Sequence, residues 1–367
     1  ILHKFLKIKV FKNQLVKYRV DRYFIADIKL RILNITTIEK FDSKKMYKIY
    51  DEWPIIARKS FESQQKTFDF KNIEHIVIAG MGGSGAIGDI LSAILSKTKI
   101  HVNVIKGYVL PTTVDANTLV ITVSVSGNTV ETLSILKSAY KIKSKIIAFS
   151  SGGKMLEYCK KNKIEHRFVT QYHSPRASFT SYLYTILNVL HSTLKIKKQD
   201  ILESIIELEN INKIINSSNL TNTNKSLNIA KKISGIPLIY YPFGLQSVAI
   251  RFKNTIQENI KNHAIAEDVV EACHNGIVSW EKESNVSPIL IQGKDDYIKT
   301  KERWIIIKDY FNENKIKYIE IDSIEGSILS KLINLIYILD YASIYKAVLM
   351  KTDPTPVKSI QYIKKKL

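Results

Sequence analysis

Two loops in the first half of this chain combine glycines with hydroxyl side chains and could bind an anion. Gly80-Met-Gly-Gly-Ser-Gly85 follows one short apolar run, and Ser124-Val-Ser-Gly-Asn-Thr-Val-Glu-Thr132 follows another. Each loop falls where a strand should end and a helix begin, so unpaired helix N–H groups would face a bound anion. Glycine lets the backbone approach ligand oxygens, and hydroxyl groups donate hydrogen bonds without adding charge. The pattern predicts a phosphate site formed by Gly83, Ser84, Ser124, Ser126 and Thr129.

Neither loop has the surroundings of a nucleotide-binding motif. Dinucleotide-binding folds place an acidic residue at the end of the second strand, and this chain has no convincing candidate there. A P-loop would carry a lysine after its glycines, and neither loop has one. The simpler alternative is a pair of tight turns with helix caps. It accounts for one glycine-rich loop better than for two loops with three closely spaced hydroxyls.

Glu258 in the second half is a candidate proton carrier. On the helix predicted over 245–260, Arg251, Asn254 and Glu258 share one face, next to an apolar stripe. One carboxylate on such a face could take a proton from one carbon and return it to the next. The alternative is a solvated helix face with a weak Arg–Glu ion pair.

Strand and helix signals alternate along most of the chain, as in a parallel sheet covered on both faces. We predict an α/β fold made of two similar domains, each a doubly wound parallel sheet, joined at the polar run 216–224. The predicted strands are Ile73–Ala79, Thr118–Val125, Lys145–Phe149, one around Arg167–Thr170, Pro237–Tyr241, Ala264–Val269, Pro288–Gln292 and Lys317–Ile321. The first domain would span residues 46–215 and the second 216–367.

Residues 1–45 differ in character from the rest of the chain. They are rich in Lys and Arg, and they mix helical and strand-like patterns without caps or turn signals. From Met46 the sequence has the character of a genuine protein start. We therefore predict that residues 1–45 are a disordered or spurious extension. A basic targeting or nucleic-acid-binding arm is the alternative.

The composition is that of a globular protein, with 45% hydrophobic and 24% charged residues in 367. The formal charge is +21, but the lysines are spread along the chain, which argues against a nucleic-acid partner. A basic field would still attract anionic sugar phosphates. Two cysteines and no secretory signal indicate the cytoplasm and no disulfide framework. The most apolar stretch, 330–350, contains Lys331, Asp340 and Lys346 and is predicted to be a core helix, not a membrane span.

The run from Ser124 to Thr132 resembles the phosphosugar-binding signature of the sugar isomerase (SIS) domain. The wider pattern is similar to the bifunctional phosphoglucose/phosphomannose isomerase family, over about Met46 to the C-terminus. It comprises Gly80–Gly85, Ser151-Gly-Gly153, Pro175-Arg-Ala177, Arg251-Phe-Lys-Asn-Thr-Ile-Gln-Glu-Asn259, His274-Asn275 and Asp353-Pro354. The resemblance implies a tandem of two SIS domains that interconverts glucose-6-phosphate and mannose-6-phosphate with fructose-6-phosphate through a cis-enediol. It implies no cofactor and no metal, and the histidines and carboxylates show no metal-ligand spacing.

The resemblance also implies a role for each catalytic residue. Glu258 would shuttle the proton, and Arg176 would stabilise the negative oxygen of the intermediate. His274 and Lys364 would assist ring opening, with Lys358 as the alternative to Lys364. His274 would come from the neighbouring subunit, which implies a homodimer. Val357 stands where some members would carry a polar residue, so the preference between glucose and mannose epimers stays open.

Two other functions fit the SIS signature. A non-catalytic phosphosugar-binding regulator would bind without turnover. Another SIS enzyme, such as an amino-sugar phosphate deaminase, would release ammonia.

Overall fold

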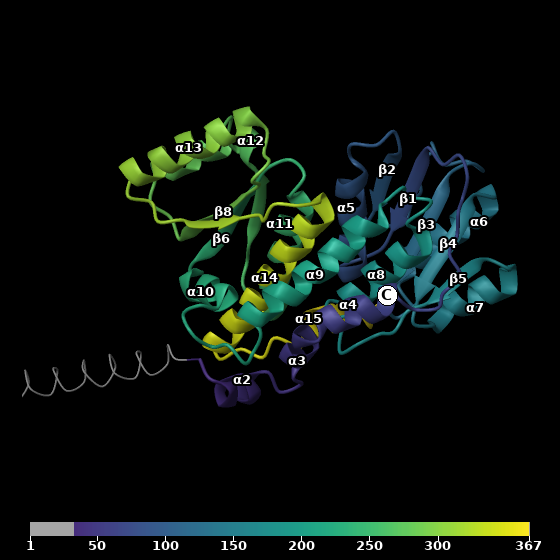
Figure 1. Cartoon of the computed structure of the whole chain (residues 1–367), viewed down its shortest axis with the longest axis horizontal. Coiled ribbons are helices and arrows are strands. Elements are labelled where there is room, and N and C mark those ends of the chain that lie inside the picture. Colours follow the sequence, from purple (N-terminus) through teal and green to yellow (C-terminus); the bar gives the residue numbers. More distant parts are fainter. Residues whose placement is uncertain (1–32, 367) are drawn as a thin grey trace, which may run out of the picture.

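The computed structural model describes residues 33–366, which form two α/β domains with long helices between them (Figure 1). The first domain has a five-stranded parallel sheet of order β2-β1-β3-β4-β5. Its strands are β1 (His75–Ala79), β2 (His101–Ile105), β3 (Leu119–Ser124), β4 (Lys145–Ser150) and β5 (Glu165–Phe168). The second domain has a four-stranded parallel sheet of order β7-β6-β8-β9. Its strands are β6 (Ile236–Tyr241), β7 (Ile265–Asp268), β8 (Val286–Gln292) and β9 (Ile319–Asp322).

Helices cover both faces of each sheet, as predicted (Figure 1). The helices before β6 are α2 (Ile35–Phe41), α3 (Met46–Asp51), α4 (Trp53–Phe61), α5 (Gly83–Leu95), α6 (Val130–Ile142), α7 (Gly153–Asn162), α8 (Phe179–Leu190), α9 (Lys198–Ile215) and α10 (Lys225–Lys232). After β6 come α11 (Gln246–Thr255), α12 (Val269–Ala272), α13 (Ile298–Glu313), α14 (Ile328–Leu349) and α15 (Lys358–Lys364). The prediction of two parallel-sheet domains is confirmed.

One hydrophobic core runs through both domains. Alternate residues of a strand point to opposite faces, so Ile76 of β1 and Ile239 of β6 reach this shared core. Their neighbours Val77 and Tyr240 belong to smaller clusters on the outer faces. The two sheets therefore present their inner faces to the same set of central helices, which fixes the domains against each other.

Helix α14 is the centre of that shared core. It is long and apolar enough to cross a membrane, but 89% of its apolar window is buried inside the fold. Its charged residues all have partners: Lys331 pairs with Asp295, Asp340 with Arg251, and Lys346 donates to the Ile233 carbonyl. It is thus a core helix, as its charges predict.

Residues 33–45 differ from the prediction of a disordered extension; the rest of that segment, 1–32, lies outside the described residues. Asn34 caps α2 by accepting a hydrogen bond from the Thr37 N–H. Leu33 and Ile38 are buried in the shared core. The Ser43 hydroxyl donates to Asp353 at 2.7 Å, which ties this segment to the chain near the C-terminus.

A pair of truncations measures what this segment contributes. A chain starting at Leu33 and one starting at Met46 differ only in residues 33–45. Burying a large aliphatic side chain contributes about 1.5–3 kcal/mol, so losing Leu33 and Ile38 should lower the free energy of unfolding by about 3–6 kcal/mol. Urea denaturation of the two chains checks this. Equal stability would show that the segment does not hold the fold.

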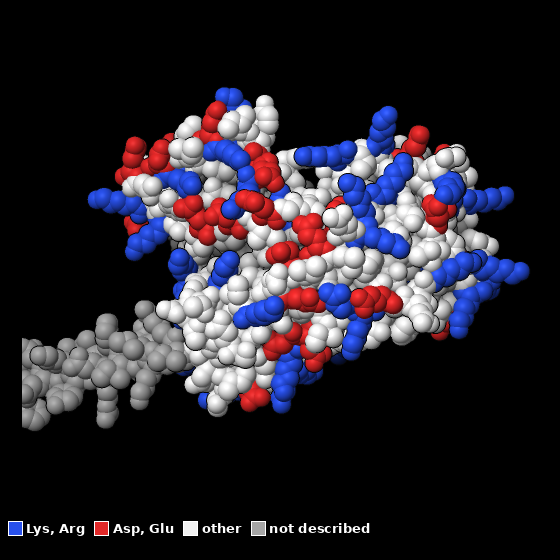
Figure 2. All heavy atoms as spheres, viewed as in Figure 1, with Lys and Arg blue, Asp and Glu red and all other residues white. Residues whose placement is uncertain are grey.

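Positive and negative side chains are mixed over the visible face of both domains (Figure 2). No block of lysines stands out there as a track for nucleic acid. On this face the basic side chains are spread over both domains.

Candidate active site

The two predicted anion-binding loops lie side by side at the carboxyl edge of the first sheet. β1 and β3 are adjacent parallel strands, with Ala79 level with Thr122. The helices that follow them, α5 and α6, have no side-chain N-cap, so their first N–H groups can serve a bound anion. The Ser124 and Thr129 hydroxyls are 2.9 Å apart. Ser84 and Ser124 are buried, while Ser126 is exposed at the outer rim of the loop.

Gly127 fixes the shape of the second loop. It has a φ of 69°, and a Cβ there would lie 1.8 Å from the Gly152 carbonyl oxygen. Only glycine fits such a backbone conformation and approach. The Ser151-Gly-Gly153 turn therefore packs directly on the phosphate-binding loop and holds it in position.

Glu258 lies on a widened turn, not on the regular helix predicted over 245–260. The α-helical pattern ends with α11 at Thr255, and residues Ile256–Ile260 form one turn of π-helix. Such turns are frequent at functional sites. The three residues predicted to share one helix face are therefore not all together. Arg251 is buried in the core, whereas Asn254 and Glu258 line a cavity together.

Arg176 is buried, with 5% of its side chain exposed, and it reaches Glu258. Its Nη1 donates to Glu258 Oε2 at 3.0 Å, and its Nε donates to Asn259 Oδ1 at 2.8 Å. Its Nη2 donates to the carbonyls of Pro354 and Thr355. Gly83 lies against Pro175 and Arg176, since a Cβ on it would be 3.2 Å from the Pro175 carbonyl. The first phosphate loop, Arg176 and Glu258 are thus neighbours.

A buried ion pair supports Arg176 from behind, and sequence reasoning did not find it. Arg251 Nη2 lies 2.6 Å from Asp340 Oδ2, with side chains 2% and 1% exposed. The same nitrogen donates to the backbone carbonyl of Arg176 at 3.0 Å. The Arg251 guanidinium also stacks on Phe179, 4.0 Å from the ring centroid. Arg251 therefore positions the backbone of Arg176.

Lys261, a second residue that the sequence did not single out, ends the π turn. Its amine donates to the carbonyls of Glu258 and Pro354. Partial burial of the amine, and then the nearby Arg176 guanidinium, lower the pKa of Lys261 to about 8. In the sequence, the feature that could have identified Lys261 is its position three residues after the candidate base Glu258.

A cavity of about 830 Å³ joins these elements. It is lined by Gly82 of the first loop, by Asn254, Gln257, Glu258 and Lys261, and by Pro356, Val357, Lys358, Ser359 and Ile360. Lys358 is among the lining residues and Lys364 is not; Lys364 lies exposed at the far end of α15.

His274 lies away from this cavity within the chain. It is exposed on the turn after α12, where its backbone N–H donates to the Glu271 carbonyl. It is not among the residues that line the cavity with Glu258. Within one chain, then, the structure brings together the first phosphate loop, Arg176 and Glu258, with the second loop following the adjacent strand, but not His274.

The lowered pKa of Lys261 predicts that activity in this cavity decreases at alkaline pH. Above about pH 8 the amine loses its charge beside Glu258 and Arg176, so kcat/KM for an anionic substrate should fall there. Lys261→Arg should move the fall to higher pH, because a guanidinium stays protonated. The unfolded chain keeps this proton to higher pH than the folded chain does. The cost of burying the charged amine is therefore relieved, and the free energy of unfolding rises, as the pH increases above about 8. A pH–rate profile of both proteins, with folding followed in parallel, checks this; identical profiles would contradict it.

Comparisons with known proteins agree with this geometry. Residues 69–190 match the family described as SIS domain, and residues 222–367 match the bacterial phospho-glucose isomerase C-terminal SIS domain. A bifunctional phosphoglucose/phosphomannose isomerase from Caldicellulosiruptor bescii is 34% identical over 81% of this chain and 90% of its own length. One from Aquifex aeolicus is 31% identical over 84% and 94%. A solved structure of a hypothetical protein from Thermus thermophilus has a TM-score of 0.70, with 12% identity over 95% of each chain, and shares the fold.

Proposed function

Since the chain belongs to the bifunctional phosphoglucose/phosphomannose isomerase family, we propose that it interconverts glucose-6-phosphate and mannose-6-phosphate with fructose-6-phosphate. One observation carries this proposal. A single cavity contains the phosphate-loop residue Gly82 and the carboxylate of Glu258, which Arg176 holds. A phosphate bound at the loops would place the sugar carbons along the cavity toward Glu258.

In this mechanism the substrate phosphate binds the helix N-termini and the hydroxyls of Ser84, Ser124, Ser126 and Thr129. Glu258 removes the proton from C2 of the open-chain aldose and returns it to C1, so one group is base and then acid. Arg176 stabilises the negative oxygen of the cis-enediol intermediate. For mannose-6-phosphate, rotation about C2–C3 of the intermediate presents the opposite face to the same carboxylate.

Ring opening also needs an acid/base group, and His274, which would assist it, lies outside the cavity within one chain. We propose that His274 of the partner subunit enters the cavity, which makes the homodimer the active form. The exposed turn that carries His274 is free to reach a second copy. The proposed location is the cytoplasm. No cofactor, nucleic acid or membrane enters the proposed reaction.

The isomerase assay separates this function from its rivals. Fructose-6-phosphate formation is measured from glucose-6-phosphate and, separately, from mannose-6-phosphate, with excess chelator. Turnover of both sugars supports the proposal. Tight phosphosugar binding without turnover would point to a regulator, and ammonia release from an amino-sugar phosphate would point to a deaminase.

The ring-opening lysine of α15 can be assigned with two matched variants. The resemblance points to Lys364, while Lys358 is the one that lines the cavity. Lys358→Ala and Lys364→Ala each remove one exposed lysine, so neither should unfold the protein. We expect kcat to fall about 10²-fold, the lower end of acid–base contributions, in the variant whose lysine takes part in ring opening. Unchanged kcat in both would remove α15 from the mechanism.

A further inference from the structure

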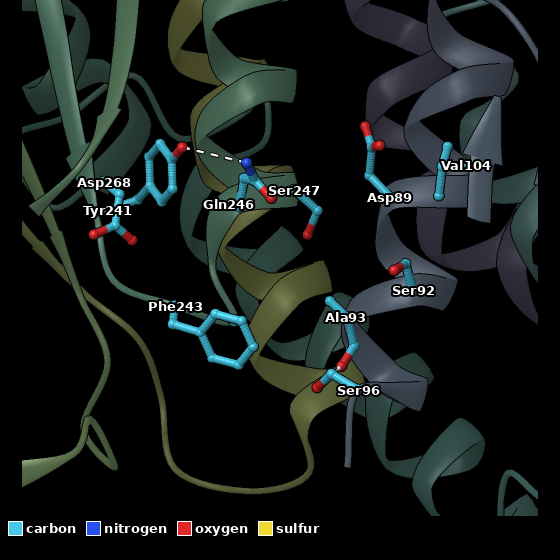
Figure 3. Close-up of a pocket in the computed structure, with 11 residues that line it drawn as sticks. Asp89, Ser92, Ala93, Ser96, Val104, Tyr241, Phe243, Gln246, Ser247 and Asp268 are labelled. Carbon is cyan, nitrogen blue, oxygen red and sulfur yellow. Dashed lines mark hydrogen bonds between the residues drawn. The ribbon is translucent and has the colours of Figure 1, made fainter. Parts of the chain in front are cut away.

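The two domains enclose a second cavity at the other end of α5 from the phosphate loops. It has a volume of about 450 Å³ and lies between α5, β2 and the segment from β6 into α11. Figure 3 shows Tyr241, Gln246 and Asp268 on one side of it and Asp89 and Ser92 on the other. None of these residues has a role in the proposed isomerisation.

This cavity occupies in the second domain the place of the phosphate site in the first. β1 and β6 are each the second strand of their sheet: β2 lies outside β1 and β7 lies outside β6, at the edge, and the remaining strands lie on the other side. Each leads through a glycine of positive φ, Gly82 at 54° and Gly244 at 96°, into a helix. Ser84 and Ser247 are the second residues of those helices, α5 and α11, and both side chains are buried. The two cavities are equivalent positions of a repeated fold.

Ser247 gives an independent reason to expect a ligand. Its side chain is 2% exposed and lines the cavity. Its Oγ has no hydrogen-bond partner among residues 33–366. Figure 3 shows the Ser247 side chain on the α11 side of the cavity, directed toward the α5 side. Buried polar groups nearly always have a partner because leaving one unpaired is costly. Helix α11 also lacks a side-chain N-cap, so its first N–H groups add donors at the same place.

The chemistry of the lining differs from that of the phosphate site. The loop after β8, the counterpart of the hydroxyl loop after β3, is Gln292-Gly-Lys-Asp-Asp296, and it does not line the cavity. Asp268 and Asp89 add carboxylates to the cavity. Asp89 pairs with Lys106 at 2.6 Å, and Asp268 Oδ1 accepts the N–H groups of Val270 and Glu271. Carboxylates repel a phosphate, but together with hydroxyl and amide groups they bind sugar hydroxyls well. Phe243, 82% exposed, places a flat apolar ring at the rim.

We propose that this cavity binds an unphosphorylated polyhydroxyl compound, such as a free hexose. Ser247 and the start of α11 hold one edge of the ligand, the carboxylates and Gln246 accept its hydroxyl protons, and Phe243 covers its apolar face. The proposal is independent of the isomerase function, since it uses other residues.

Binding of D-glucose to the full-length chain tests this, measured by titration calorimetry. Ser247→Ala should weaken glucose binding by about tenfold, the upper range for one hydrogen bond. It should leave isomerase activity and thermal unfolding unchanged, because the Ser247 hydroxyl makes no hydrogen bond in the described chain. The exposed Gln246→Ala is the second variant, with an effect in the same direction.

Ser124→Ala, in the phosphate loop, is the matched control and should leave glucose binding unchanged. Inorganic phosphate should not compete with glucose. Three results would overturn the proposal: no glucose binding, glucose binding that is unchanged in Ser247→Ala, or a change in oligomeric state in Ser247→Ala that accounts for the effect.

Discussion

Glu258→Gln should lower kcat by roughly a thousandfold, within the 10²–10⁴-fold range of positioned general bases, while KM stays within a few-fold. The amide can still accept the hydrogen bond that Arg176 Nη1 gives to the carboxylate at 3.0 Å. It cannot take up a proton. Substrate binding should survive because the phosphate loops are untouched, so the loss should appear in kcat. Steady-state kinetics on both aldose phosphates measures it.

Glu258→Asp is the matched variant for this test. It keeps the charge but draws the carboxylate back by one methylene, so it should retain partial activity. Thermal unfolding of both variants controls for folding. A Glu258→Gln enzyme with kcat within tenfold of the parent would remove Glu258 as the proton carrier.

Asp340→Ala should destabilise the protein by about 3–5 kcal/mol, the usual consequence of removing one member of a buried ion pair. It would leave the Arg251 guanidinium, 2% exposed, without its carboxylate. Tyr50 would also lose the acceptor of its hydroxyl, at 3.1 Å. Chemical denaturation gives the magnitude. A loss under 1 kcal/mol would show that the pair does not hold the central helices together.

A double variant separates the structural role of this pair from its effect on the site. Arg251→Met with Asp340→Leu replaces both charges by apolar groups of similar size, beside Phe179. Such replacements are often neutral or stabilising, so stability should return. Activity should not return, because the Arg176 carbonyl has lost the donor at 3.0 Å. Full recovery of kcat would show that Arg251 has no positioning role.

The sequence predicts the elements that are buried on both faces. β1, β3, β6 and β8 appear as short apolar runs because each has neighbours on both sides and helices above and below. β2 was not found from the sequence. It is an edge strand whose residues, His-Val-Asn-Val-Ile, are exposed or half-buried, so no apolar run marks it.

Local sequence carries less information about the site. Periodicity assumes 3.6 residues per turn, so it could not reveal the π turn that separates Arg251 from Glu258. The partners of Arg176 lie at Asn259 and at 354–355, far along the chain, and only the fold brings them together. Residues 33–45 gave no strong signal because their burial depends on docking against the distant α14.

The most direct test of the proposed isomerisation starts from fructose-6-phosphate in D₂O and follows the products by NMR. If Glu258 moves a proton through a cis-enediol, the carboxylate can exchange that proton with solvent before returning it. We expect glucose-6-phosphate and mannose-6-phosphate both to appear, with deuterium at C2 in at least part of each. Absence of either aldose would contradict the bifunctional activity. Aldoses with only protium at C2 would contradict the solvent-exchanging proton transfer.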